Sequence, residues 1–271
     1  MKIFGRFGFG PKERITFVGL RRFNMLMAVL HTAQGLVVLW ISDPTRGLQP
    51  ISTSFLTLDK HLSTTNHPVL VQSTRHLFDL NLAYLVAAFF FISAIAHLVI
   101  ATIYRARYEQ GLKQGINRAR WIEYSFSASV MMVGIALLSG IFDLSTLILI
   151  FTLDAVMNLM GWAMEVHRLQ SGKTRWFDYW VGVLAGAVPW IVFGIYVWGA
   201  ANYGSGVPGF VYWIYGSIFL FFTSFAVNMA LQYKKIGRWK SYLYGERTYI
   251  ILSLVAKSAL AWQVFAGTLR P

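Results

Sequence analysis

The 271-residue sequence contains no cysteine, which excludes disulfide bonds and chemistry that uses a thiolate. Charged residues are scarce: they make up 13% of the chain, against about 25% in a typical soluble domain. Acidic residues are the scarcest, with 11 Asp and Glu against 24 Lys and Arg. Hydrophobic residues, in contrast, make up 56%. This balance predicts a membrane protein.

Several catalytic signatures are also missing from the sequence. It has no HExxH motif and no GxSxG motif, and no group of residues has the spacing of metal ligands. We therefore predict that the protein is not an enzyme and binds no metal. The N-terminal stretch MKIFGRFGFGPKER has basic residues but no apolar signal-peptide core.

Long apolar runs dominate what is present. A helix needs about 20 apolar residues to cross a hydrocarbon core about 30 Å thick. Seven runs meet this requirement, at about 23–42, 79–103, 121–141, 145–166, 178–200, 209–232 and 248–268. We predict an all-α membrane protein in which residues 1–271 form a single bundle of seven transmembrane helices.

The basic residues predict the direction of the bundle. Of the 24 Lys and Arg, 19 lie before the first run or in alternate loops, and four (Arg46, Lys60, Arg75 and Arg270) lie on the other side. Positive residues favour the cytoplasmic side. We expect a cytoplasmic N-terminal segment, 1–22, and an extracellular C-terminus in the cell membrane. This bias explains the net charge of +13 without a nucleic-acid partner.

The first two runs are joined by the longest connection, about residues 43–78, which is then external. Its stretch STSFLTL (52–58) alternates Ser or Thr with apolar residues. This pattern fits short β-strands, forming a small hairpin, and fits an irregular ordered loop equally well.

One lysine lies in the middle of the last run, in ILSLVAKSALAWQ (251–263). A charge at a helix centre costs roughly 2.5–3.5 kcal/mol on insertion scales, so Lys257 needs a reason to be there. It is either a structural cation or an amine that reacts with an aldehyde to form a Schiff base. Retinal is an aldehyde that dissolves in membranes.

A protonated Schiff base needs a counter-ion, and two carboxylates lie inside runs. Glu123 has Ser127 one turn later on the same face; alternatively, it pairs with Arg120 at the interface. Asp154, followed by Asn158 and Trp162, is either a second acid or a hydrogen-bonded or protonated structural residue.

Other polar and aromatic residues inside the runs suggest a cavity and a ligand slot. His31 with Gln34, and His97 with Ser93, form pairs on one helix face that point to a shared polar cavity. Each histidine alone is more often structural. The aromatic content of 16% suits a slot for a long apolar ligand. Its candidate residues are Tyr124, Trp162, Pro189, Trp190, Phe222 and Trp262, and we expect Pro189 to interrupt the fifth run.

Four segments carry a resemblance to a known family: RWIEYS (120–125), VPWI (188–191), VPGFVY (207–212) and GERTYIILSLVAKSALAWQ (245–263). With a lysine in the seventh run and an internal N-terminus, the sequence resembles the heliorhodopsins. The microbial pumps usually have an Asp four residues before that lysine, where this chain has Ser253.

The resemblance implies specific roles. All-trans retinal would be bound to Lys257 with Glu123 as counter-ion, and Ser127 and Ser253 would lie beside them. His31, Gln34, Ser93 and His97 would form the polar cavity. It also implies a slow photocycle, a homodimer and a small β-structure in the external loop. Asp154 matches no acid of the family.

We therefore expect a light-sensing photoreceptor that signals to an unknown cytoplasmic partner. The alternative is a light-driven or light-gated ion transporter. The sensor is favoured because, apart from Glu123 and Asp154, the runs contain acids only near their ends.

Overall fold

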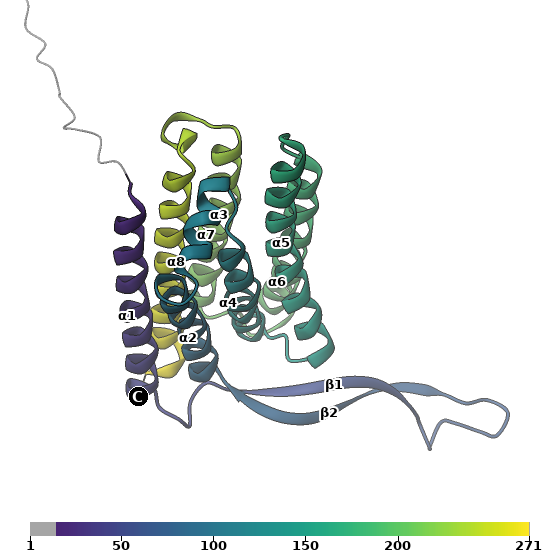
Figure 1. Cartoon of the computed structure of the whole chain (residues 1–271). Coiled ribbons are helices and arrows are strands. Elements are labelled where there is room, and N and C mark those ends of the chain that lie inside the picture. The colour runs from purple at the N-terminus through teal and green to yellow at the C-terminus, as the bar shows by residue number, and fades with distance from the viewer. Residues whose placement is uncertain (1–14, 271) are drawn as a thin grey trace, which may run out of the picture.

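The computed structural model describes residues 15–270, and these contain seven helices that are long and apolar enough to cross a membrane. The seven helices run side by side as a bundle (Figure 1), which confirms the predicted fold. They are α1 (Phe17–Ile41), α2 (Leu82–Ala101), α4 (Arg118–Leu138), α5 (Leu144–Ser171), α6 (Trp176–Tyr203), α7 (Gly209–Tyr233) and α8 (Tyr242–Val264), which continues as the π-helical turn η2 (Phe265–Leu269). A short helix, α3 (Arg105–Gln114), and a 3-10 turn, η1 (Gly237–Lys240), lie in two of the connections.

Side-chain caps explain where several spanning helices begin. The side chains of Thr16, Asn81, Asn117 and Asp143 accept hydrogen bonds from backbone N–H groups in the first turns of α1, α2, α4 and α5. Such caps satisfy donors that have no partner inside the helix. The cap at Thr16 starts α1 well before residue 23, so the predicted segment 1–22 is partly helical. Its first 14 residues lie outside the described residues.

The fifth spanning helix differs from expectation. Pro189 does not interrupt it, because α6 is continuous from Trp176 to Tyr203 with this proline inside. Proline removes one backbone donor, but membrane helices tolerate the loss when neighbouring groups satisfy the backbone. Next to the proline, the Tyr215 hydroxyl of α7 donates to the carbonyl oxygen of Trp190, at 2.9 Å, which joins α6 to α7.

The connection between α1 and α2 is a β-hairpin. Strand β1 (Leu48–Leu58) pairs antiparallel with β2 (Leu70–Asn81), with an irregularity between Ile51 and Ser52. The predicted strand at 52–58 is thus confirmed, but β2 also includes residues 79–81, which we had expected in the second span. The hairpin projects sideways at the end of the bundle opposite α3 (Figure 1). Ser52 N–H donates to the Phe142 carbonyl, which joins the hairpin to the α4–α5 turn.

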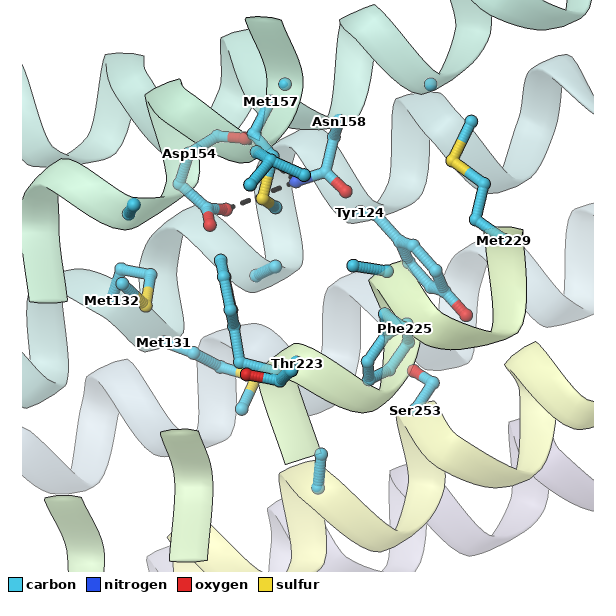
Figure 2. Close-up of a pocket in the computed structure, with 18 of the residues that line it drawn as sticks. Tyr124, Met131, Met132, Asp154, Met157, Asn158, Thr223, Phe225, Met229 and Ser253 are labelled. Atoms are coloured by element: carbon cyan, nitrogen blue, oxygen red, sulfur yellow. Dashed lines mark hydrogen bonds between the residues drawn. The ribbon is translucent and has the colours of Figure 1, made fainter. Parts of the chain in front are cut away.

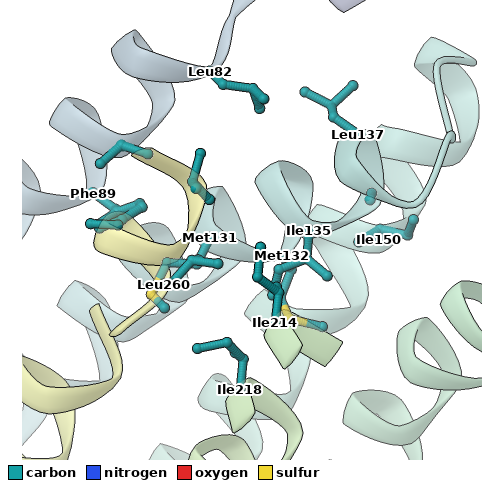
Figure 3. Close-up of a cluster of buried hydrophobic side chains, with 14 of the residues drawn as sticks. Leu82, Phe89, Met131, Met132, Ile135, Leu137, Ile150, Ile214, Ile218 and Leu260 are labelled. Atoms are coloured by element: carbon teal, nitrogen blue, oxygen red, sulfur yellow. The ribbon is translucent and has the colours of Figure 1, made fainter. Parts of the chain in front are cut away.

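The two halves of the bundle interior differ in chemistry. The half nearest the hairpin is filled by one hydrophobic cluster, part of which is drawn in Figure 3. Its members include Leu82, Phe89, Ile135, Ile150, Ile214 and Leu260. The buried charged residues lie toward the other end, where α1 and α4 begin and α2 and α5 finish; they are Arg120, Glu123, Asp154, Glu165, Asp178, Glu246 and Lys257. The buried charges of the described residues therefore lie in the middle of the bundle and in the half nearest α3.

Candidate functional site

The buried lysine of α8 lies beside a carboxylate of α4. Nζ of Lys257 lies 3.2 Å from Oε1 of Glu123 and 2.7 Å from Oγ of Ser253. The Lys257 and Glu123 side chains are only 3% and 5% exposed. Ser253 is four residues before Lys257, so both side chains lie on one face of α8. This pairing agrees with the prediction that a buried ammonium needs an opposite charge.

The environment of Glu123 is built by two helices besides α8. Its Oε1 accepts hydrogen bonds from Ser93 of α2, at 2.5 Å, and from Ser127 of α4, at 2.6 Å. Bonds to the charged form favour ionisation of a carboxyl group. The alternative pairing of Glu123 with Arg120 is wrong, because the Arg120 guanidinium binds two other carboxylates. Glu123 reaches the depth of Lys257 because α4 starts at Arg118, before the predicted span.

The two predicted histidines lie together. The rings of His31 and His97 are stacked, with centroids 5.6 Å apart. His97 Nδ1 lies 2.7 Å from Oδ1 of Asn24, a partner that the sequence had not suggested. Both ring nitrogens of His31 are buried without a hydrogen-bond partner among the described residues. Gln34, the fourth residue of the predicted polar cavity, is half-buried, and its side chain makes no hydrogen bond to another of the described residues.

An apolar cavity of about 350 Å³ begins at the lysine. Lys257, Ser253, Tyr124, Trp190 and Phe222, all predicted site residues, are in its wall. Figure 2 shows several other lining residues, among them Met131, Met132 and Phe225. Pockets for small ligands measure roughly 300–1,000 Å³ and are mostly apolar. A buried amine opening into an apolar, aromatic cavity of this size fits retinal, which is a long apolar aldehyde.

Three predicted slot residues are placed elsewhere. Trp162 and Pro189 are not among the residues that line the cavity. Trp162 packs instead against the aromatic cluster of Trp121 and Tyr249. Trp262 is 39% exposed and contacts Phe265, so its side chain lies at the outside of the bundle. Its position five residues after Lys257 turns it away from the face that carries the lysine.

A second charged cluster was missed by the sequence analysis. Arg120 lies between Glu165 of α5, at 2.6 Å, and Glu246 of α8, and all three side chains are buried. Asn117 and Trp121 donate to the same carboxylates. The guanidinium also lies over the ring of Tyr249, 4.1 Å from its centroid. Nothing in the sequence signals this cluster, since its members are 45 and 126 residues apart.

The two charged groups are neighbours. A small cavity of about 20 Å³ is bordered by Glu123 and His97 on one side and by Arg120, Asn117 and Glu246 on the other. This volume is enough for about one water molecule. The cluster also reaches α3, because the Tyr108 hydroxyl lies 3.3 Å from Oε1 of Glu246. Burial raises the pKa of Tyr108 well above its usual value, so this hydroxyl keeps its proton and donates.

Comparisons with known proteins agree with this geometry. The chain resembles the crystal structure of LR (Mac), a light-driven proton pump from Leptosphaeria maculans, with a TM-score of 0.60 and 12% identity over 94% of this chain and 97% of that one. At this identity the likeness concerns the fold alone. Among curated proteins, none matches the sequence. The family model for heliorhodopsin matches residues 20–269. The chain therefore belongs to the heliorhodopsin family, whose members bind retinal through a lysine Schiff base, and is a retinal-binding, light-responsive membrane protein.

Proposed function

We propose that this protein is a light sensor that signals through the end of the bundle bearing α3, and that it does not pump ions. The one-sided interior carries the proposal. Buried charged and hydrogen-bonding groups extend from Lys257 toward α3, whereas the hydrophobic cluster fills the half nearest the hairpin. A pump needs ionisable groups along a path on both sides of its retinal lysine.

In this proposal Lys257 carries the retinal and Glu123 is the counter-ion. The short contacts of Glu123 with Ser93 and Ser127 favour its charged form, and Ser253 fixes the direction of the lysine side chain. Two opposite charges about 4 Å apart attract by about 4 kcal/mol at an effective dielectric constant near 20. When bound, retinal supplies the absorption of visible light and a double bond that isomerises.

The signal would pass through the second charged cluster. Glu123 and Glu246 border the same small cavity, and Glu246 accepts from Arg120, Asn117 and Tyr108. A change in the charge of the Lys257–Glu123 pair alters the field at Glu246 and so the hydrogen bond that holds α3. The wall of a cavity of about 330 Å³ between α3 and α4 includes Tyr108 and Asn117. We propose this surface as the place where the output appears.

The proposed orientation puts that output in the cytoplasm. The α3 helix, the start of α1 and the α7–α8 connection lie at one end of the bundle (Figure 1). Most of the 24 Lys and Arg belong to this end, which is the cytoplasmic end by the positive-inside rule. The hairpin and the C-terminus would then be extracellular.

The proposal is tested in two steps on retinal-loaded protein. In sealed vesicles, illumination should produce neither a pH change nor a current that a protonophore abolishes. Hydrogen exchange of α3 should nevertheless increase in the light, and Tyr108→Phe should remove most of that increase. A sustained light-driven pH change would overturn the proposal, and so would α3 exchange that is identical in light and dark.

A light-driven ion transporter remains the second candidate. It is supported by Asp154 and the paired histidines, which place ionisable groups at other points near the lysine. The vesicle experiment separates this candidate from the sensor. That the protein has no enzymatic activity stays a prediction from the missing motifs.

We also propose that the protein is a homodimer in which the hairpin takes part. Strands β1 and β2 expose apolar side chains on one face of the hairpin, including Leu56, Leu58 and Leu70, which pairs with Leu58. Exposed hydrophobic groups on paired strands are typical of surfaces that another chain covers.

A further inference from the structure

From the surroundings of Asp154 we infer that this residue is a protonated carboxylic acid that donates a hydrogen bond to Ser129, and that it is a positioning residue for the light reaction. The acid lies in the middle of α5 and has no exposed surface. It lines the same cavity as Lys257, and Figure 2 shows it beside Asn158. The heliorhodopsin resemblance gives it no role.

The contacts of Asp154 are those of a neutral acid. Its Oδ2 lies 3.1 Å from Oγ of Ser129 and 3.2 Å from Nδ2 of Asn158. Its Oδ1 is buried with no hydrogen-bond partner. Among the described residues no Lys, Arg or His lies within ion-pair distance of it, although Lys257 borders the same cavity. An ionised carboxylate buried with so few partners would be very unfavourable.

Glu123 provides the comparison within the same bundle. One oxygen of Glu123 takes two hydroxyl contacts of 2.5 and 2.6 Å as well as the ammonium of Lys257. Asp154 has only two long contacts and no cation. The two buried acids therefore differ in protonation state: Glu123 is ionised and Asp154 is neutral.

The direction of the Ser129 bond follows from counting hydrogens. A serine hydroxyl has a single hydrogen. Oγ of Ser129 lies 2.8 Å from the carbonyl oxygen of Ser125, which can only accept. The longer contact from Ser129 to Asp154 is then completed by a hydrogen on Oδ2 of the acid. Asn158 donates to Oδ2 and, at 2.9 Å, to the backbone oxygen of Asp154.

This hydrogen bond has a mechanical consequence. It joins α5 to α4, the helix that also carries Glu123, beside the retinal cavity. When a ligand in the cavity changes shape, it displaces the side chains that line the cavity on α4 and α5, and the hydrogen bond makes these two helices move together. Asp154 thus positions α4, and with it Glu123, relative to Lys257.

Infrared spectroscopy tests the charge state in protein free of retinal. This inference concerns the proposed retinal site, but the retinal-free measurement does not depend on it. At neutral pH, the spectrum should contain a C=O stretch of a protonated acid that Asp154→Asn removes and isotopically labelled aspartate shifts. Ser129→Ala should move the band to higher frequency, since the acid loses its acceptor. Glu123→Gln is the matched control and should leave it in place.

The positioning role is tested in protein loaded with retinal. The same band should shift between dark and light. Ser129→Ala, which removes the acceptor, should change the lifetime of the light-induced state by about fivefold, as expected for loss of one net hydrogen bond. Asp154→Asn, whose amide group can still donate to Ser129, should change the lifetime less. If Asp154→Asn removes a carboxylate band instead of an acid band, the inferred charge state is wrong. If Ser129→Ala leaves the band at the same frequency, the inferred hydrogen bond is wrong. If light leaves the band at the same frequency, the positioning role is wrong. Labelled aspartate and Ser129→Ala keep the test decisive should Asp154→Asn misfold.

Discussion

Nζ of Lys257 lies 3.2 Å from Oε1 of Glu123, and among the described residues no other carboxylate lies within ion-pair distance of this lysine. The lysine and the acid are 134 residues apart and come from α8 and α4. Both side chains are buried, and the attraction between their opposite charges offsets the free-energy cost of placing each charge in a hydrocarbon environment.

Lys257→Ala should abolish the visible absorption band of protein reconstituted with retinal, because no other lysine lies inside a span. The seven-helix fold should persist, as measured by circular dichroism. Lys173→Ala, in the α5–α6 connection, is the control and should form pigment normally. A full-strength band in the Lys257 variant would show that the attachment site is elsewhere.

Glu123→Gln keeps the shape of the side chain and removes its charge. The Schiff base should then lose its proton at a lower pH than in the parent, because its positive form has lost its counter-ion. The visible band should shift strongly to the blue if the proton leaves, and modestly to the red if it stays. Asp154→Asn should change this titration much less. The opposite order of effects would identify Asp154 as the counter-ion.

Arg120→Gln should destabilise the protein strongly. The variant leaves Glu165 and Glu246 buried without their shared cation, and removing one partner of a buried ion pair costs about 3–5 kcal/mol. Denaturant or thermal unfolding in detergent measures the change. Arg118→Gln, on an exposed position of the same helix, should stay within about 0.5 kcal/mol of the parent. Equal effects of the two variants would mean that the cluster adds no stability.

Asp143 should make stability depend on pH in the acid range. The Thr146 backbone N–H, which donates to this carboxylate, holds the pKa of Asp143 below its usual value, and the N–H of Ser54 in the hairpin also donates to it. A lowered pKa stabilises the fold above the ordinary value of about 3.9, and that contribution is lost as pH falls through the folded pKa. Asp143→Asn should lower the melting temperature at neutral pH and flatten its fall on acidification. An unchanged acid profile in this variant would contradict the assignment.

The proposed dimer can be tested on one strand of the hairpin. Leu56 and Leu58 are exposed and lie on the same face of β1, since side chains two residues apart in a strand point the same way. The double change to Glu should convert the dimer to a monomer in mild detergent, measured by light scattering after size-exclusion chromatography. Thr57→Glu, on the opposite face of the same strand, should leave the dimer intact. A dimer that survives the double change would exclude this face from the interface.

The bundle could be predicted from the sequence because hydrophobic length is a local signal. The boundaries were less accurate. Residues 79–81 were expected in a helix because they continue an apolar run, but the Asn81 cap starts α2 only at Leu82 and leaves them in β2. The expected interruption at Pro189 was also wrong, because a membrane helix can tolerate one missing backbone donor, and α6 continues through the proline.

The site was predictable where one residue is unusual in its own surroundings, as Lys257 is. It was not predictable where the meaning of a residue depends on distant partners. Arg120 reads as one more basic residue at the end of a loop, and only the fold brings Glu165 and Glu246 to it. Trp262 was chosen for its closeness in sequence to Lys257, but helical rotation places it at the outside.

The apolar half of the bundle also bears on how the membrane potential acts on this protein. A charge that crosses the whole hydrocarbon core gains or loses about 2.3 kcal/mol per 100 mV. A proton exchanged between Lys257 and Glu123, 3.2 Å apart, crosses at most about a tenth of a core about 30 Å thick, which is worth only about 0.2 kcal/mol at that voltage. The hydrophobic cluster gives the charge no onward route toward the hairpin side. The light response should therefore be the same in an energised cell and a depolarised one, which suits the proposed light sensor, since its output would then not depend on the energy state of the membrane.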